Sequence, residues 1–349
     1  MYPDDAPYPD DRSRPSRWLV LMQLALGAAL MLGIGFGVRA LMERATARSL
    51  PEGFARVRPP HEVSALAEQG DIVWAGGTGG LYAIDRATAT LRPLPAGAPN
   101  MRRVRDLLID AEGRLWIAHR DGLTLYDAGT WRSWTADDGL LPGPALSLCL
   151  DRDGALWVGT EGGVARRRGD GWEQFTVENG LGAPQVDVIF QDSAGVMWFG
   201  SASPTRGGLS RYDGTWCFFT VAEGLTHDSV NAIIETREGT LWFATGFANS
   251  GGATRLVDGE WSGLSQSDGL AGEKVRSVFE DRDGRLWFGS EYDGMAVRDG
   301  VEWRILTPDD GLAGWEIKET IQDAYGAYWL GTEDGVTRIA HWSLIAAGG

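Results

Sequence analysis

The segment "DRDGRLWFGS", residues 281–290, joins an Asp-x-Asp-Gly sequence to a short run of strand-forming residues that contains Trp287. The acidic part could be a metal-binding loop or a turn between two strands. A calcium loop of the EF-hand type needs more oxygen ligands over twelve residues and a terminal glutamate, which this segment lacks. The segment therefore predicts a hairpin turn and no metal site.

The same pattern occurs seven times along the 349 residues of the chain. Each copy has a glycine followed within a few residues by a tryptophan and then by small residues, and successive tryptophans are 41 to 45 residues apart. A regular period of this length predicts a repeat architecture. We expect a structural role for the seven tryptophans, which are Trp74, Trp116, Trp157, Trp198, Trp242, Trp287 and Trp329.

Each repeat holds four short segments in which β-branched or aromatic residues alternate with polar ones, and glycines separate the segments. In the sixth repeat these are residues 274–281, 285–290, 294–300 and 302–307. Alternation predicts strands joined by tight turns, whereas a helical solenoid would need a period of 3.6 residues. Four antiparallel strands in about 42 residues are typical of a propeller blade. The sequence therefore predicts an all-β fold, a seven-bladed β-propeller of four-stranded antiparallel blades.

Two further features recur in the repeats. The fourth strand carries a second tryptophan in five of them, and Gly-Leu recurs in five links between blades. We expect the two tryptophans of a blade to cover the faces between neighbouring blades. The fourth-strand tryptophans are Trp131, Trp172, Trp216, Trp261 and Trp303.

The propeller is expected to occupy residues 61–349. Blade one would start with "EVSALAEQ" at residue 62, and blade seven would end with "HWSLIAAGG", residues 341–349, so that no strand exchange is needed. In the alternative arrangement, residues 54–58 add an outer strand to blade seven.

Residues 18–38 form a run of 21 residues without a charged side chain. Such a run can span a membrane as a helix, and it exceeds the 7–15-residue core of a cleaved signal peptide. We predict a transmembrane helix that acts as a signal anchor and precedes the propeller, with cleavage near residues 45–47 as the alternative. Residues 1–17 are predicted to be a disordered tail and residues 39–60 a linker. Arginines are equal in number on both sides of the run, so they do not set its orientation.

The repeats resemble the two-component regulator propeller repeat, most clearly in "VDVIFQDSAGVMWFGS" and "VRSVFEDRDGRLWFGS". The resemblance covers residues from about 61 to 345. It implies an extracytoplasmic sensor propeller, here on a single-pass protein of the bacterial inner membrane. In that family the membrane span and a histidine kinase or other output domain follow the propellers. Here the predicted span precedes a single propeller and no output region is recognised.

The net charge of −16 argues against nucleic acid as a partner. Cys149 and Cys217 are expected on an inner and an outer strand, as two buried free thiols. The four histidines match no metal or catalytic motif, so we predict no catalytic residues and no cofactor. A streptogramin-lyase-like enzyme is the catalytic alternative, in which His119 and His227 would share one face of the ring.

Ligand binding is expected on the face that carries the blade links and the connections between second and third strands, called here the link face. The opposite face, with the connections between first and second strands, is the hairpin face. Connections on the link face are longer in blades four to six, and variable loops on a rigid scaffold often bind ligands. The candidate ligand-binding residues are Arg206, Phe247, Asn249, Tyr292, His119 and His227. They suit a small molecule, a glycan, a peptide or a membrane signalling partner protein. The predicted function is non-catalytic recognition within a signalling system, with a scaffold subunit of a membrane complex as the alternative.

Overall fold

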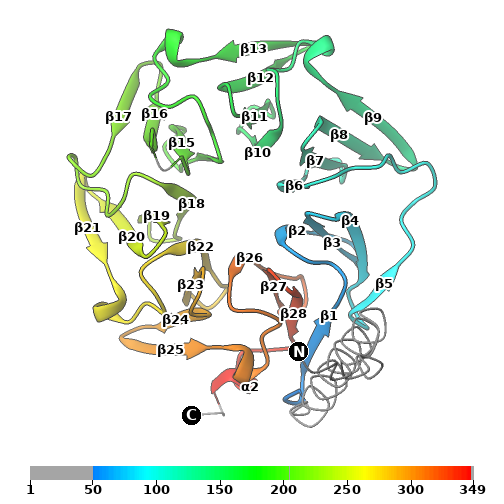
Figure 1. The fold of residues 1–349 in the computed structure, drawn as a ribbon, viewed down its shortest axis with the longest axis vertical. Coiled ribbons are helices and arrows are strands. Elements are labelled where there is room, and N and C mark those ends of the chain that lie inside the picture. The colour runs from blue at the N-terminus through cyan, green and yellow to red at the C-terminus, as the bar shows by residue number, and fades with distance from the viewer. Residues whose placement is uncertain (1–49, 204, 347–349) are drawn as a thin grey trace, which may run out of the picture. The chain divides into compact units, whose positions relative to one another are not determined.

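The repeats fold into seven four-stranded antiparallel sheets in the part of the chain that the computed structural model describes, residues 50–203 and 205–346. The sheets are arranged as a ring of blades around a central channel (Figure 1). The predicted propeller is therefore confirmed. The predicted tail and transmembrane helix lie outside the described residues. No helix within those residues is long and apolar enough to cross a membrane.

In each blade the first strand lies nearest the centre of the ring and the fourth lies at its periphery (Figure 1). The first strands are β2 (Val63–Gln69), β6 (Asp106–Ile109), β10 (Ala145–Leu150), β14 (Val188–Gln191), β18 (Val230–Glu235), β22 (Val275–Glu280) and β26 (Ile317–Gln322). The second strands carry the repeated tryptophans and are β3 (Ile72–Gly77), β7 (Leu115–His119), β11 (Leu156–Thr160), β15 (Met197–Ser201), β19 (Leu241–Phe247), β23 (Leu286–Ser290) and β27 (Tyr328–Thr332).

The third strands are β4 (Gly80–Asp85), β8 (Gly122–Asp127), β12 (Val164–Arg168), β16 (Gly208–Tyr212), β20 (Ser250–Val257), β24 (Met295–Asp299) and β28 (Gly335–Ile339). The fourth strands are β5 (Thr90–Arg92), β9 (Thr130–Trp134), β13 (Gly171–Phe175), β17 (Trp216–Phe219), β21 (Glu260–Leu264) and β25 (Glu302–Leu306), with β1 (Phe54–Val57) in blade seven.

Blade seven is closed by the N-terminal part of the propeller. β1 pairs antiparallel with β28, with Phe54 opposite Ile339. The alternative with an outer strand near residues 54–58 is thus correct, and the expectation that residues 341–349 complete this blade without strand exchange is wrong. Because β1 covers the free edge of β28, no edge is left for the C-terminal residues, and Ser343–Ala346 form the short helix α2 instead. The propeller therefore begins within the range predicted as a linker.

The seven repeated tryptophans are all buried, with at most 3 % of each exposed. In five blades an aspartate six residues earlier accepts a hydrogen bond from the indole Nε1. These pairs are Trp116 with Asp110, Trp157 with Asp151, Trp198 with Asp192, Trp287 with Asp281 and Trp329 with Asp323, at 2.8 to 3.1 Å. In blade one, Gln69 accepts from Trp74 at 2.8 Å.

The same aspartates organise the hairpin turns, which confirms the turn predicted at residues 281–284. Oδ1 of Asp281 accepts from the backbone N–H groups of Asp283 and Arg285, and its carbonyl accepts from Gly284. Gly284 has φ +87°, a conformation that glycine adopts without strain. Because these donors within the blade use the oxygens of the Asp281 carboxylate, the carboxylate has a structural role. Within the described residues, no group of three or more His, Cys, Asp or Glu is placed to hold a metal ion.

The recurring Gly-Leu pairs end short turns between blades. Four of the links hold a 3-10 helix: η1 (Ala136–Asp138), η2 (Val177–Asn179), η3 (Gln266–Asp268) and η4 (Pro308–Asp310). The glycine that follows has positive φ and lies against the fourth-strand tryptophan of the next blade, as Gly269 does against Trp303. At Gly311 the ring of Phe54 takes that place, so Phe54 substitutes for the missing fourth-strand tryptophan of blade seven.

The two cysteines are free, as expected, but they are not both buried. Cys149 on β10 is half-buried, and burial raises the pKa of its thiol to about 12. Cys217 is exposed on the peripheral strand β17, where it follows the half-buried Trp216.

Candidate functional site at the mouth of the channel

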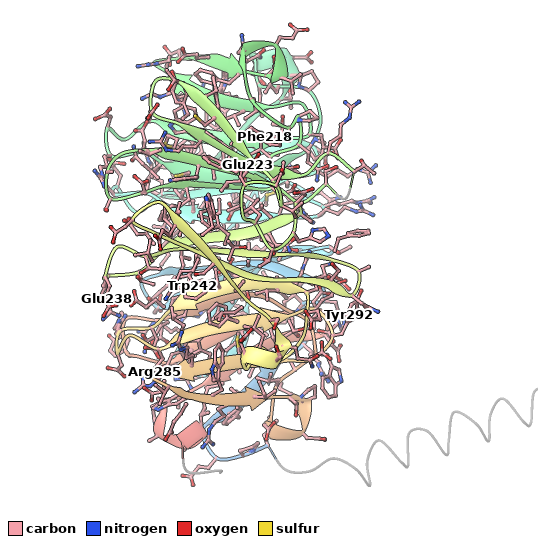
Figure 2. All side chains as sticks on the ribbon, turned by 90° about the vertical axis from the view of Figure 1, so that its left-hand side faces the viewer. Phe218, Glu223, Glu238, Trp242, Arg285 and Tyr292 are labelled. Atoms are coloured by element: carbon pink, nitrogen blue, oxygen red, sulfur yellow. The ribbon has the colours of Figure 1, made fainter. Side chains whose placement is uncertain are left out.

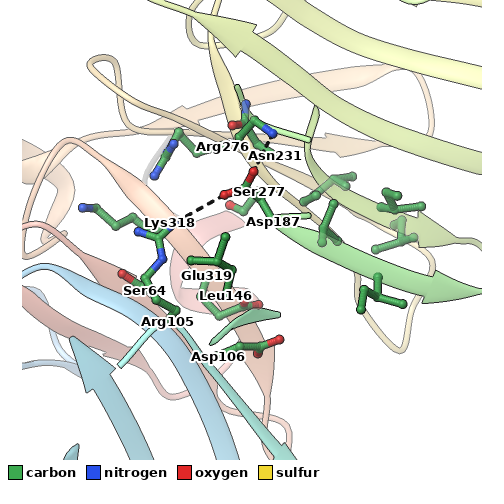
Figure 3. A pocket seen from close by; sticks show the side chains of 17 residues that line it. Ser64, Arg105, Asp106, Leu146, Asp187, Asn231, Arg276, Ser277, Lys318 and Glu319 are labelled. Carbon is green, nitrogen blue, oxygen red and sulfur yellow. Dashed lines mark hydrogen bonds and ion pairs between the residues drawn. The ribbon is translucent and has the colours of Figure 1, made fainter. Parts of the chain in front are cut away.

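A cavity of about 220 Å³ lies at the link-face end of the central channel (Figure 3). Every blade contributes to its lining, because the residues at the start of the seven inner strands converge there. These residues are Ser64, Arg105, Leu146, Asp187, Asn231, Arg276 and Lys318. The repeat thus places one variable side chain per blade at the mouth, on seven rigid strands.

Most of the charged groups in this cavity are paired. Arg105 lies 3.8 Å from Asp187, and on the other side Arg276 and Lys318 lie 3.2 Å and 3.1 Å from Glu316. Lys318 also pairs with Glu62. Except for the pair of Lys318 with Glu316 within blade seven, these ion pairs join different blades. They leave little free charge in the channel itself.

Two acids directly follow the mouth residue of their blades, at a position where other blades have Ala, Ser or Val. These are Asp106 on β6 and Glu319 on β26. Burial raises the pKa of Asp106 to about 7, although the N–H groups of Leu148 and Leu107 donate to its carboxylate and favour the charged form. Burial and the nearby charge of Asp106 raise the pKa of Glu319 to about 8. The channel therefore contains two carboxyl groups that titrate near neutral pH.

A second cavity of about 610 Å³ adjoins the first and shares Ser64, Arg105, Leu146 and Asp187 with it. Arg103 and Arg120 also line this cavity. Arg102 is exposed in the same link as Arg103, and its carbonyl accepts from the N–H of Arg120 in the connection between β7 and β8. Their guanidinium groups form no ion pair or hydrogen bond with any residue that the structure describes. In a strongly acidic chain, this unpaired group marks a positively charged part of the link face. We call Arg102, Arg103 and Arg120 the arginine cluster.

Two predicted site residues are exposed aromatics over blades five and six. Phe247 is 46 % exposed and Tyr292 is 53 % exposed. Between their positions, the buried Lys274 pairs with Glu291, and the Lys274 ammonium lies 5.5 Å from the centre of the Phe247 ring. Figure 2 shows Tyr292 on one face of the ring and Glu238 and Arg285 on the opposite face. The ion pair therefore lies next to the Phe247 ring and includes the residue before Tyr292.

The predicted loops of blades four to six differ in nature. In blade five, β19 and β20 extend to the pair Phe247–Ser250, so Phe247 ends a strand and Asn249 lies in a two-residue turn with Ala248 at φ +52°. This extension was expected to be a loop because its glycines read as turn residues. Arg206 is exposed after Ser203 in blade four. Among the described residues, the side chains of Arg206 and Asn249 form no hydrogen bond or ion pair.

His119 at the end of β7 and His227 in the link before β18 both lie on the link face, but neither is exposed. His119 is 6 % exposed, its Nε2 contacts Thr124 Oγ1 at 2.9 Å, and its Nδ1 accepts from the N–H of Asp121. It occupies the position of Thr160 in blade three, whose hydroxyl likewise accepts from the N–H two residues on. Burial lowers the pKa of His119. His227 Nδ1 accepts from the N–H of Ser229. Among the described residues, no hydrogen bond or ion pair joins a histidine to a glutamate.

Sequence reasoning missed the arginine cluster and the two channel acids. Aligning the seven repeats by their tryptophans would have shown Asp106 and Glu319 at a position that is otherwise small. The arginines gave a weaker signal, because whether an arginine is paired depends on neighbours in other blades.

Three segments of the chain, residues 139–162, 224–247 and 269–292, match the family model described as Two component regulator propeller. Each runs from a Gly-Leu link through the tryptophan strand to the link face. The chain is thus a propeller that carries two component regulator propeller repeats. No curated protein matches the sequence.

Solved structures with the same fold include a domain of Bacteroides thetaiotaomicron and two single propellers. The first is described as the extracellular domain of a hybrid two component system, BT3049, with 19 % identity and a TM-score of 0.74 over 85 % of this chain and 42 % of that one. This chain therefore spans less than half of that solved domain. A catalytically inactive virginiamycin B lyase from Staphylococcus aureus with quinupristin has 15 % identity and a TM-score of 0.63, covering 82 % and 97 %. YCF48 from Cyanidioschyzon merolae has 17 % identity and a TM-score of 0.61, covering 83 % and 98 %. At these identities the likeness concerns the fold.

Proposed function

We propose that this protein is a non-catalytic recognition module of a signalling system and binds an anionic ligand at the mouth of its channel. The arginine cluster carries the proposal. Three exposed guanidinium groups, which have no partner among the described residues, lie beside a cavity of about 610 Å³ in a chain with a net charge of −16. A guanidinium offers a planar set of donors that matches carboxylate, sulfate or phosphate oxygens.

Phe247 and Tyr292 give the same face a second kind of contact, since flat aromatic surfaces take up rings and apolar groups. A ligand with a charged end and a flat or apolar part would use both. The family resemblance supports a sensory role, because the first solved structure is described as an extracellular domain of a two component system. We further propose that residues 18–38 anchor the protein in the bacterial inner membrane, with the propeller on the extracytoplasmic side.

The test starts with a thermal-shift screen of the full-length protein in detergent against small carboxylates, phosphates and sulfated and neutral sugars. A ligand found in this way should lose affinity at least tenfold in the double variant Arg103→Ala/Arg120→Ala, the loss of about one charge-assisted hydrogen bond. Phe247→Ala and Tyr292→Ala should also weaken it.

Asp153→Ala is the matched control, because Asp153 lies in a hairpin turn on the other face and should leave affinity unchanged. Equal affinity in all variants would show that the ligand binds elsewhere. A stoichiometric membrane protein that co-purifies with the full-length chain, with no small-molecule hit, would favour the scaffold alternative instead.

A further inference from the structure

Blade five departs from the other six in the hydrogen bonding of its central tryptophan. Trp242 is 3 % exposed, like its counterparts, yet its Nε1 has no acceptor among the described residues. Among the described residues, the Trp242 N–H is not one of the fully buried polar atoms that lack a partner, so solvent reaches it and an external acceptor can reach it too.

The cause is a substitution six residues before the tryptophan, where blade five has Thr236 in place of an aspartate. Thr236 Oγ1 accepts from the N–H of Thr240 at 3.2 Å, which reproduces the bond from Ala155 to Oδ1 of Asp151 in blade three. A hydroxyl has one oxygen and a carboxylate has two. The second carboxylate oxygen, which accepts from the indole in blade three, therefore has no counterpart in blade five.

A second donor of the same arrangement is still present. In blade three Arg166 faces Trp157 across the strand pair and donates to Oδ2 of Asp151 at 2.9 Å. Arg255 holds the equivalent position opposite Trp242. It forms no ion pair with a described residue, and its only side-chain hydrogen bond there goes to Ser262 Oγ at 3.3 Å. Blade five thus keeps an indole donor and a guanidinium donor and lacks the acceptor.

These groups line a groove of about 250 Å³ between blades five and six. The groove opens towards the hairpin face, away from the channel mouth, as the positions of Glu238 and Trp242 relative to Tyr292 show in Figure 2. Two acids, Glu238 and Glu280, also line it. Glu280 accepts from the N–H of Arg237 at 2.9 Å, so it is already occupied.

We propose that this groove binds a carboxylate from outside the blade, which takes the place of the missing aspartate side chain. One oxygen of the bound group accepts from Trp242 Nε1, and Arg255 neutralises its charge. Thr236 leaves the space that the carboxylate needs. The ligand is either a small free carboxylate or the acidic side chain of a polypeptide, since both present the same group.

The experiment uses full-length protein in detergent, labelled with 5-fluorotryptophan and observed by fluorine NMR. Trp242→Phe identifies the signal of Trp242. Sodium acetate is titrated at constant pH and at an ionic strength matched with sodium chloride. The Trp242 signal of the parent protein should shift to saturation with acetate. Arg255→Gln should weaken acetate binding by about tenfold, the usual effect of one charge-assisted hydrogen bond.

Thr236→Asp is the decisive variant, because it restores the internal carboxylate. Its Trp242 signal should resemble the acetate-bound parent and should no longer respond to acetate. N-acetylaspartate methylamide is titrated in parallel: tighter binding than acetate assigns an acidic polypeptide as the ligand, and weaker or equal binding assigns a small carboxylate. A response that never saturates, or that is the same in the parent and Thr236→Asp, overturns the proposal and leaves water as the occupant.

Discussion

The indole Nε1 of Trp157 donates to Oδ2 of Asp151 at 2.8 Å, and both residues are buried between blades three and four. Replacing Asp151 with alanine would leave the indole and Arg166 without their acceptor and would free two N–H groups of the turn. We expect Asp151→Ala to lower the free energy of unfolding by about 3 kcal/mol. Urea unfolding followed by tryptophan fluorescence measures this.

Thr236→Ala serves as the comparison for that variant. Thr236 holds a single turn N–H and no indole, so its removal should cost about 1 kcal/mol. If both substitutions cost the same, the bond to the indole adds nothing to stability.

Trp287 is completely buried, and its ring centre lies 4.4 Å from that of Tyr328 in blade seven. Trp287→Ala should cost about 3–5 kcal/mol, the range for a buried aromatic side chain. Because the ring must close, the whole propeller should melt at a lower temperature in a single transition in calorimetry. A separate early transition from one blade would show instead that the blades unfold independently.

Phe54 joins the two ends of the ring, through the pairing of β1 with β28 and its contact with Gly311. Phe54→Ala should cost about 2–3 kcal/mol, since the side chain is only partly buried. Phe247→Ala, which truncates an exposed ring, should stay within about 0.5 kcal/mol of the parent. Equal melting temperatures for the parent and Phe54→Ala would mean that the seam is not needed for closure.

Glu319 gives the stability of the propeller a pH dependence. Its pKa is about 8 in the folded chain because of burial and the charge of Asp106, against an ordinary value of 4.5. Between these pH values the unfolded chain binds fewer protons than the folded chain. The contribution of protonated Glu319 to the free energy of unfolding is therefore complete below pH 4.5 and is lost as the pH rises through 8. The melting temperature should therefore fall from about pH 5 to pH 8.5.

Glu319→Gln should remove most of that decline. Asp106→Asn should have a smaller effect, because two backbone N–H groups stabilise the charged form of Asp106. A decline of equal size in the parent and in Glu319→Gln would place its origin in other groups.

The fold could be predicted because the sequence pattern of each repeat indicates its strands and turns. Residues equivalent to Trp287, Asp281 and Gly284 recur in other repeats and have the same roles there. The repeats therefore all support the same assignment of strands and turns. The closure of blade seven was less certain, because Phe54 replaces a tryptophan and lies far from the repeat that it completes. The candidate site was predictable only in part. The exposure of Phe247 and Tyr292 follows from their place on the link face. In contrast, the lack of an ion-pair partner for Arg103 among the described residues and the burial of His119 depend on which side chains of other blades lie nearby.

The pairing of Phe54 with Ile339 also means that blade seven can be completed only at the end of translation. The strand that completes blade seven is made first, and its partner strand is made last. At 5–20 residues per second, β1 waits roughly 15 to 60 seconds for β28 to be translated. Throughout that time both edges of the nascent propeller lack a neighbour. Only a chain translated through residue 339 can form the seam, so an interrupted product is left as an open arc of blades that the quality-control proteases of the cell can recognise.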